Sequence, residues 1–146
     1  MAITDQQVAA LRAQLAGDVE EHQRLLEQLD PATDNEGYAT LLVAALFEAA
    51  RRRFGNNSPH HAEVVEFVGD LRSRAEVIRQ RLSADAAERV IMVAYDKGSI
   101  RDLDDETVRY AQAVIAVAII SDEQLTDEGL DAFMAEVRSV AEQVLA

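Results

Sequence analysis

The sequence predicts an all-α fold, a single domain over residues 1–146 built as a bundle of about six helices. Apolar residues recur at the three- and four-residue spacing of helices along most of the chain, and no stretch alternates with the two-residue period of a strand. Glycine, proline and short polar turns divide the chain into segments of helical length. A chain of 146 residues suits one domain, and its 49% apolar residues are enough for a core.

The most apolar segment is AQAVIAVAII, residues 111–120, in which Gln112 is the single polar residue. A helix that is apolar on every side has no solvent face, so neighbouring elements must cover it. Ten residues are too few for a bilayer, which takes about 20. We therefore expect residues 111–120 to form the central buried helix of the domain. LLVAALFEAA, residues 41–50, is a similar stretch in the first half.

The first predicted helix covers residues 5–29. Thr4 and Gln7 have the spacing of a capping box, and Pro31 follows the last turn. His22, near the apolar stripe, is expected to be a paired, partly buried histidine rather than a ligand. At 1.5 Å per residue this helix extends about 37 Å, more than a compact domain of this size needs. The excess length predicts a homodimer through this helix. Its apolar residues are Val8, Leu11, Leu15, Val19, Leu25, Leu26 and Leu29.

The second predicted helix covers residues 35–54 and ends in Arg51, Arg52 and Arg53, just before Gly55. Cations in the last turn interact favourably with the helix dipole, and glycine suits a left-handed cap. The triplet therefore has a structural explanation. It is also the candidate interaction patch of the chain, for acidic groups of this protein or of a partner.

Four further helices are predicted after the GNNSP turn at residues 55–59. The third runs to about residue 82, with a bend expected at Gly69. The fourth begins after the capping Ser83 and stops at Gly98, and the fifth contains residues 111–120. The turn SDEQLTDEG leads to the sixth, over residues 127–145.

An internal duplication is a further possibility. The segment EFVGDLRSRAEVI, residues 66–78, can be aligned with AFMAEVRSVAEQV, residues 132–144. Under this interpretation the chain consists of two three-helix units, residues 1–82 and 83–146. The alternative is chance, since helices rich in Ala, Arg, Glu and Leu match one another easily.

Composition and charge narrow the function classes. The net charge of −13 makes nucleic acid and anionic membranes unfavourable partners and favours a partner with a basic surface. The sequence has no cysteine, so it offers no disulfide framework and no thiolate. MAITDQQ at the N-terminus lacks the basic and apolar regions of a signal peptide, so we expect a cytoplasmic protein.

Candidate chemistry is sparse. His60, His61 and Glu63 form the one histidine cluster, and no second HxxE or ExxH motif completes a di-metal site. The turn after residue 120 does not have the ligand spacing of an EF-hand. Acid pairs such as Asp104 and Asp105 lie in strongly charged stretches, and no phosphate loop, nucleophile elbow or HExxH occurs. The sequence predicts no catalytic residues, no metal site and no cofactor.

One segment has a family resemblance. AVIAVAIISDEQLTDEGLDAF, residues 113–133, resembles the tellurite-resistance TerB-like helical domains, with a fainter echo at residues 38–71. The resemblance implies paired helical hairpins with an acidic turn that suggests cation binding. In this chain the turn glycine of the family falls on Glu123 and its downstream carboxylate on Gly129.

These observations favour a non-catalytic protein-interaction module with an acidic surface, such as an adaptor, an inhibitor or an immunity-type protein. The alternative is a small-ligand or cation binder that uses a cleft between the two helical units. An enzyme of unrecognised type is the third hypothesis.

Overall fold

The computed structural model describes residues 2–146 and has eight helices and no strand within that range. The all-α prediction is therefore confirmed. No helix in this part of the chain has the length and apolar character needed to cross a membrane. The helices are α1 (Asp5–Leu15), α2 (Val19–Gln28), α3 (Pro31–Phe54), α4 (His61–Ser73), α5 (Glu76–Arg81), α6 (Ala84–Val93), α7 (Asp105–Glu123) and α8 (Asp127–Leu145).

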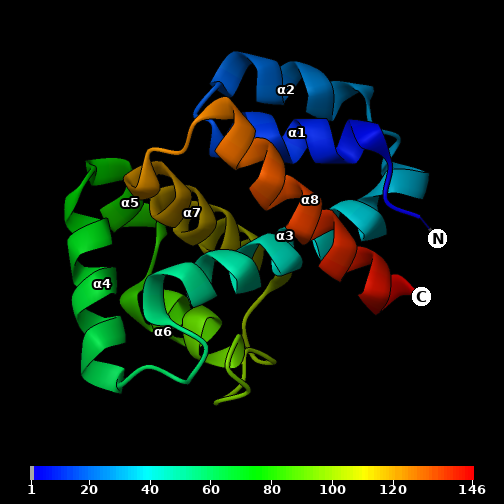
Figure 1. Cartoon of the computed structure of the whole chain (residues 1–146). Coiled ribbons are helices and arrows are strands. Elements are labelled where there is room, and N and C mark those ends of the chain that lie inside the picture. The colour runs from blue at the N-terminus through cyan, green and yellow to red at the C-terminus, as the bar shows by residue number, and fades with distance from the viewer. Residues whose placement is uncertain (1) are drawn as a thin grey trace.

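Two predicted helices are each divided, which is why eight are present rather than about six. The helix expected over residues 5–29 breaks at Gly17, whose φ of +79° lies in the left-handed region that favours glycine. Asp18 then caps α2 by accepting a hydrogen bond from the Glu21 backbone N–H at 3.1 Å. Helices α1 and α2 pack against each other (Figure 1), so the long rod from which the homodimer was inferred is absent. The homodimer itself stays a prediction.

The second division separates α4 from α5 at Arg74 and Ala75, five residues beyond the bend expected at Gly69. Arg74 donates hydrogen bonds to both Asp70 and Asp122, and this pairing raises the pKa of its guanidinium above the ordinary value. Arg72 donates to the backbone oxygens of Leu82 at 2.7 Å and Arg79 at 3.1 Å. These bonds tie the chain on both sides of the break to its neighbours.

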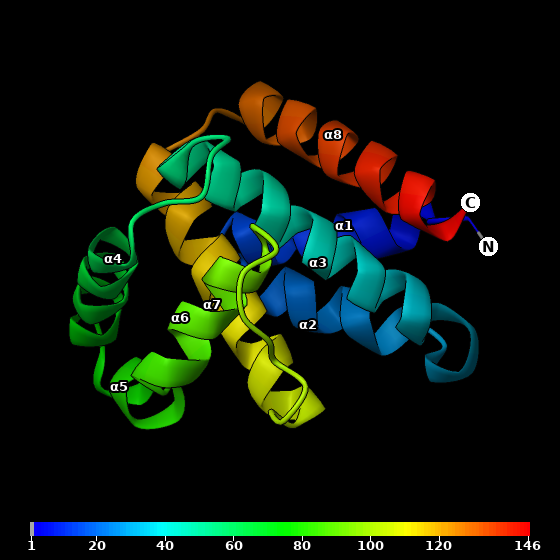
Figure 2. The same cartoon turned by 90° about the horizontal axis from the view of Figure 1, so that it is seen from below.

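Helix α7 has the central place predicted for residues 111–120. It packs against α1, α3 and α6, and Figure 2 shows it crossing the molecule with α4 and α5 on one side and α2 on the other. Ile115 and Ala116 are fully buried. Cover is nevertheless incomplete, because Ala113, Val114 and Val117 are only half-buried. The expectation that every side of this helix is covered was wrong for that face.

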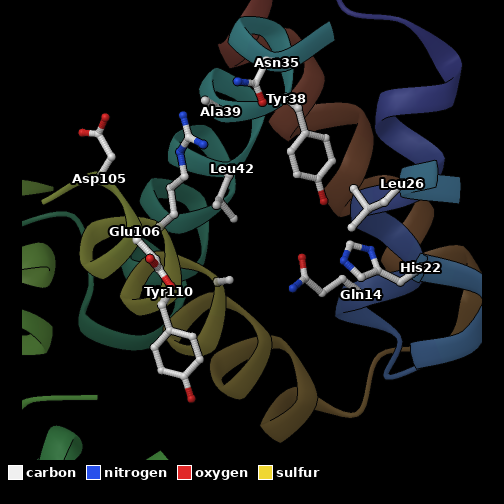
Figure 3. A pocket seen from close by; sticks show the side chains of 12 residues that line it. Gln14, His22, Leu26, Asn35, Tyr38, Ala39, Leu42, Asp105, Glu106 and Tyr110 are labelled. Carbon is white, nitrogen blue, oxygen red and sulfur yellow. The ribbon is translucent and has the colours of Figure 1, made fainter. Parts of the chain in front are cut away.

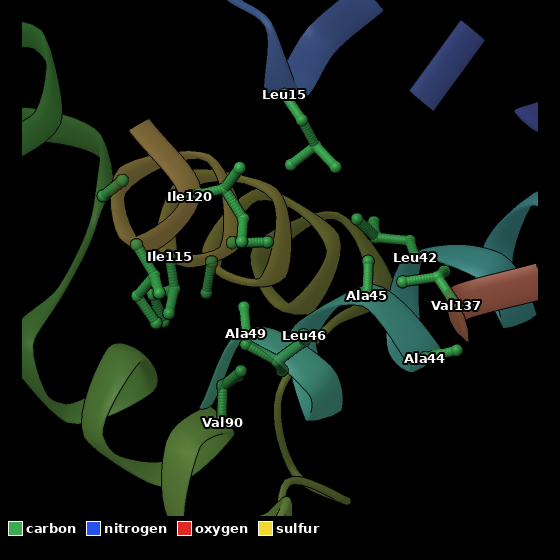
Figure 4. Packing of buried hydrophobic residues seen from close by; sticks show 14 of the residues in the cluster. Leu15, Leu42, Ala44, Ala45, Leu46, Ala49, Val90, Ile115, Ile120 and Val137 are labelled. Atoms are coloured by element: carbon green, nitrogen blue, oxygen red, sulfur yellow. The ribbon is translucent and has the colours of Figure 1, made fainter. Parts of the chain in front are cut away.

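The core consists mainly of aliphatic side chains from α1, α3, α4, α6, α7 and α8. Figure 4 shows Leu46 and Ala49 of α3 beside Val90 of α6 and Ile115 of α7. Small alanines along α3 allow close approach of the neighbouring helices. Two polar side chains are buried in the described residues, Gln112 at 8% exposure and Gln7 at 2%. Gln7 completes the predicted capping box with Thr4 and joins α1 to α3.

Candidate functional site

The uncovered face of α7 is the floor of a groove. Its residues recur at the spacing that places helix side chains on one face. The groove, with a volume of about 420 Å³, lies between the junction of α1 with α2 and the junction of α4 with α5. Floor residues are Tyr110, Ala113, Val114, Val117, Ala118 and Ser121. Gln14, Gly17 and Val19 form one wall, and Leu71, Arg74 and Ile78 form the other. We call this surface the α7 groove.

A second cavity, of about 550 Å³, lies beside the N-terminal half of α7. It shares Gln14, Tyr110 and Ala113 with the lining of the α7 groove, so the two spaces are neighbours along α7. Together they follow α7 from Glu106 to Ser121, which is about 22 Å at 1.5 Å per residue. We call the second cavity the Tyr38 pocket. Its apolar lining is Leu26, Ala39, Leu42 and Ala113, and its polar lining is Gln14, His22, Asn35, Tyr38, Asp105, Glu106, Arg109 and Tyr110.

The segments that flank the two walls of the α7 groove differ in charge. Residues 18–28, which contain α2, have four acidic residues and one arginine. Residues 72–81, which contain α5, have four arginines and one glutamate. The guanidinium carbon of Arg81 lies 4.1 Å from the centre of the Tyr110 ring, a cation–π contact at one end of the floor. The charged residue of the groove lining, Arg74, is paired with Asp70 and Asp122, so the groove itself is an apolar strip and the charge difference lies in the flanking segments.

The Tyr38 hydroxyl is the unusual polar group of this region. Its oxygen is buried and makes no hydrogen bond within the described residues. Burial raises the pKa of the phenol well above its ordinary value, because desolvation disfavours the phenolate. The hydroxyl therefore stays protonated and has a proton to donate. An unpaired buried hydroxyl costs free energy, so this group is a position at which a ligand gains affinity.

His22 is half-buried, as predicted, and its partner is the backbone oxygen of Ala10, 2.7 Å from Nδ1. A carbonyl oxygen only accepts, so Nδ1 carries the proton and donates. In the neutral ring Nε2 is then an acceptor. Figure 3 shows the His22 ring, the Gln14 amide and the Tyr38 hydroxyl pointing toward one space beside Leu26.

The three arginines of the predicted interaction patch all contact other residues of this chain. Arg51 donates to Glu48 at 3.2 Å and Arg52 to Glu123 at 2.7 Å. Arg52 also lies over the Phe133 ring, and Arg53 lies over the rings of Phe54 and Phe67. The triplet thus joins the end of α3 to α4, α7 and α8. Contact of these arginines with a partner stays a prediction.

The histidine and acidic side chains considered as metal ligands do not gather around one point. His61 approaches Glu88 with 4.0 Å between Nε2 and the carboxylate. In the acidic turn before α8, Asp122 is paired with Arg74 and Glu123 with Arg52. Over residues 2–146, no three His, Cys, Asp or Glu side chains are close enough to hold a metal ion. The TerB-like resemblance stays an expectation.

Sequence reasoning missed both the α7 groove and the Tyr38 pocket. The helical spacing of Tyr110, Ala113, Val114 and Val117 is visible in the sequence, but it was attributed to burial. Only the packing partners of α7 reveal that this face is open. No family model, curated protein or solved structure matches this chain.

Proposed function

We propose that the protein is a non-catalytic interaction module that binds an amphipathic helix of a protein partner in the α7 groove. The observation that carries this proposal is the uncovered apolar face of the most apolar helix in the chain. Amphipathic helices bind proteins by laying an apolar face into a groove of this kind. The floor of the α7 groove, from Tyr110 to Ser121, is about 16 Å long and accommodates about 11 helical residues, or three turns.

Charge complementarity supports a particular partner. The acidic segment at residues 18–28, beside one wall, favours a basic flank on the bound helix, and the arginine-rich segment at residues 72–81, beside the other wall, favours an acidic flank. A helix with an apolar face between two oppositely charged flanks is therefore favoured in one orientation over the reverse. The overall charge of −13 adds long-range attraction for a partner with a basic surface. Adaptor, inhibitor and immunity-type roles all agree with this form of binding.

A small-ligand binder is the second candidate function, and the unpaired Tyr38 hydroxyl favours it. Under the predicted organisation into units 1–82 and 83–146, the floor of the groove and pocket comes from the second unit. Most of the walls come from the first. Under that organisation, a ligand bound here would lie between the two units.

Substitution of a floor residue tests the helix-binding proposal. Val117→Glu places a carboxylate on the floor, and Val144→Glu is a matched control on α8, where the valine is 69% exposed. Immobilised wild-type protein and the Val144→Glu variant should retain a partner from the source cells, and Val117→Glu should lose it. A peptide of about 15 residues from that partner should become helical on binding, as measured by circular dichroism.

Three results would refute the proposal. These are equal retention by the two variants, a bound segment that stays non-helical, and no retained protein at all. Thermal melts of each variant check that the fold is intact. If the retained protein is a second copy of this chain, the homodimer prediction gains support and the groove is its interface.

A further inference from the structure

The Tyr38 pocket brings together polar groups from three helices. Gln14 comes from α1, His22 from α2 and Tyr38 from α3. Neither the Gln14 amide nor the Tyr38 hydroxyl makes a side-chain hydrogen bond within the described residues, whereas His22 uses only Nδ1. Figure 3 shows all three directed into the same space. Three unused hydrogen-bonding groups that converge beside apolar walls are typical of a small-molecule site.

The hydrogen-bonding role of each group follows from its surroundings. Tyr38 is a donor, because a phenol is protonated near neutral pH and burial raises its pKa further. Because Nδ1–H donates to the Ala10 carbonyl, Nε2 of His22 is an acceptor in the neutral form of the ring. Gln14 offers both a donor and an acceptor. The ligand that complements them presents a carbonyl oxygen and an N–H group side by side.

The geometry of the amide group narrows the class of ligand further. In the trans amide preferred by open chains, the carbonyl oxygen and the N–H point to opposite sides. A ring forces the amide into the cis form, which is strongly disfavoured in an open chain. In a cyclic amide, or lactam, the two groups therefore lie on one edge. Such an edge meets a donor and an acceptor that lie next to each other.

The surroundings fit a neutral ring. Leu26, Ala39, Leu42 and Ala113 supply apolar walls. The charged lining residues of this pocket, Asp105, Glu106 and Arg109, are all exposed and all come from the first turns of α7. Burying an ionised ligand next to unpaired neutral groups is unfavourable. A cavity of about 550 Å³ lies within the range of small-molecule sites.

The Leu26 side chain lies beside the buried Tyr38 hydroxyl (Figure 3). Leu26 and Tyr38 also line a smaller cavity of about 120 Å³. A ligand that reaches the hydroxyl has to displace the side chains that bury it, and this cavity is space into which Leu26 can move.

We propose that the Tyr38 pocket binds a lactam, whose carbonyl accepts from the Tyr38 hydroxyl and whose N–H donates to Nε2 of His22. This inference rests on the second candidate function, small-ligand binding, and not on helix binding in the α7 groove. The bound ring lies against Leu42 and Ala113, and Gln14 takes any further polar substituent. The open end of the pocket, with its charged residues, faces the part of the ligand that stays in solvent.

The test uses the bicyclic lactam 3,4-dihydroquinolin-2-one and its N-methyl derivative, titrated into the full chain and followed by NMR. The parent lactam should bind with chemical-shift changes centred on Gln14, His22 and Tyr38. The N-methyl compound, which lacks the N–H donor, and the Tyr38→Phe variant should each weaken binding about tenfold, the factor for one hydrogen bond of about 1.4 kcal/mol. Tyr38→Phe should not lower the thermal midpoint, because the hydroxyl has no partner to lose and its unpaired burial costs free energy.

The outcomes distinguish the lactam assignment from the broader proposal that the pocket binds a small molecule. Equal binding of both compounds, or binding unaffected by Tyr38→Phe, would overturn the lactam assignment and leave an apolar small-molecule pocket. No binding of either compound at about 5 mM would overturn small-ligand binding as well. Val117→Glu should bind the lactam normally, since Val117 does not line the Tyr38 pocket, so failure of helix binding is recognised independently.

Discussion

Two glycines inside helices should respond to alanine in opposite directions. Gly69 lies in α4, and a Cβ added there meets nothing within 4 Å. Gly37 lies in α3, and a Cβ added there would be 2.7 Å from Nε2 of Gln7. Glycine in a helix interior is about 0.5–1 kcal/mol less favourable than alanine. Gly69→Ala should therefore raise the free energy of unfolding by nearly 1 kcal/mol.

Gly37→Ala gains the same helix propensity but displaces the Gln7 amide. Nε2 of Gln7 donates to the Asp34 oxygen at 2.9 Å, Oε1 accepts from the Thr4 N–H at 2.9 Å, and the side chain is 2% exposed. Leaving a buried donor without its acceptor costs about 1–3 kcal/mol. The net effect of Gly37→Ala should then be a loss of about 1 kcal/mol. The two variants should differ by about 2 kcal/mol.

Urea unfolding and thermal melts measure both variants. At about 2–4 °C per kcal/mol for a chain of this size, the two midpoints should move to opposite sides of the wild-type value. A double variant supplies the control, because Gly37→Ala in a Gln7→Ala background has no amide to displace and should stabilise. A Gly37→Ala protein that melts higher than wild type, as Gly69→Ala should, would refute the close approach of α1 and α3.

Two further predictions concern helix ends. The Tyr95 hydroxyl donates to the oxygens of Ala50 at 3.1 Å and Gly55 at 2.7 Å, at the end of α3. Tyr95→Phe should therefore lower the unfolding free energy in urea by about 1 kcal/mol, and an unchanged midpoint would show that these bonds contribute nothing. Asp104 caps α7, and the hydrogen bond from the Thr107 backbone N–H lowers its pKa below the ordinary 3.8. The stabilisation by the ionised Asp104 carboxylate is fully present above the pKa of the unfolded state and is lost as the pH falls through the lowered pKa of the folded state. Asn caps the helix without titrating. The melting-point advantage of wild type over Asp104→Asn should shrink between about pH 5 and pH 3, and a constant or growing advantage would contradict this assignment.

The predictions that held depend on local signals, and those that failed depend on distant contacts. Short stretches of sequence are enough to identify the capping box of Thr4 and Gln7, the Ser83 cap and the α7 segment. The division at Gly17 also had a local signal, a glycine followed by the capping Asp18, but apolar periodicity continues across it and masked it. At the division between α4 and α5, Arg74 pairs with Asp122, 48 residues away, and no local pattern encodes that contact.

The arginine triplet shows the same limit. Its place in the last turn of α3 follows from helix electrostatics, which the sequence contains. Its partners do not follow, because Glu123 and Phe133 reach Arg52 only after α7 and α8 have packed against α3. The Tyr38 pocket is harder still to foresee. It consists of residues from four helices, and its defining feature is a hydrogen bond that Tyr38 does not make.

The fold alone does not account for valine at positions 114 and 117. Valine is a weaker helix former than glutamate, arginine or leucine, and both side chains are only half-buried. A long charged residue at either position would keep its aliphatic stem against the core and place its charge in solvent. Such a residue would favour the helix and the solubility of the monomer, so the folded monomer gains little from valine here. The gain lies in a state where the face is covered. Comparing Val117→Glu with wild type therefore separates folding from binding, because near-equal stability with lost binding assigns these valines to an interface.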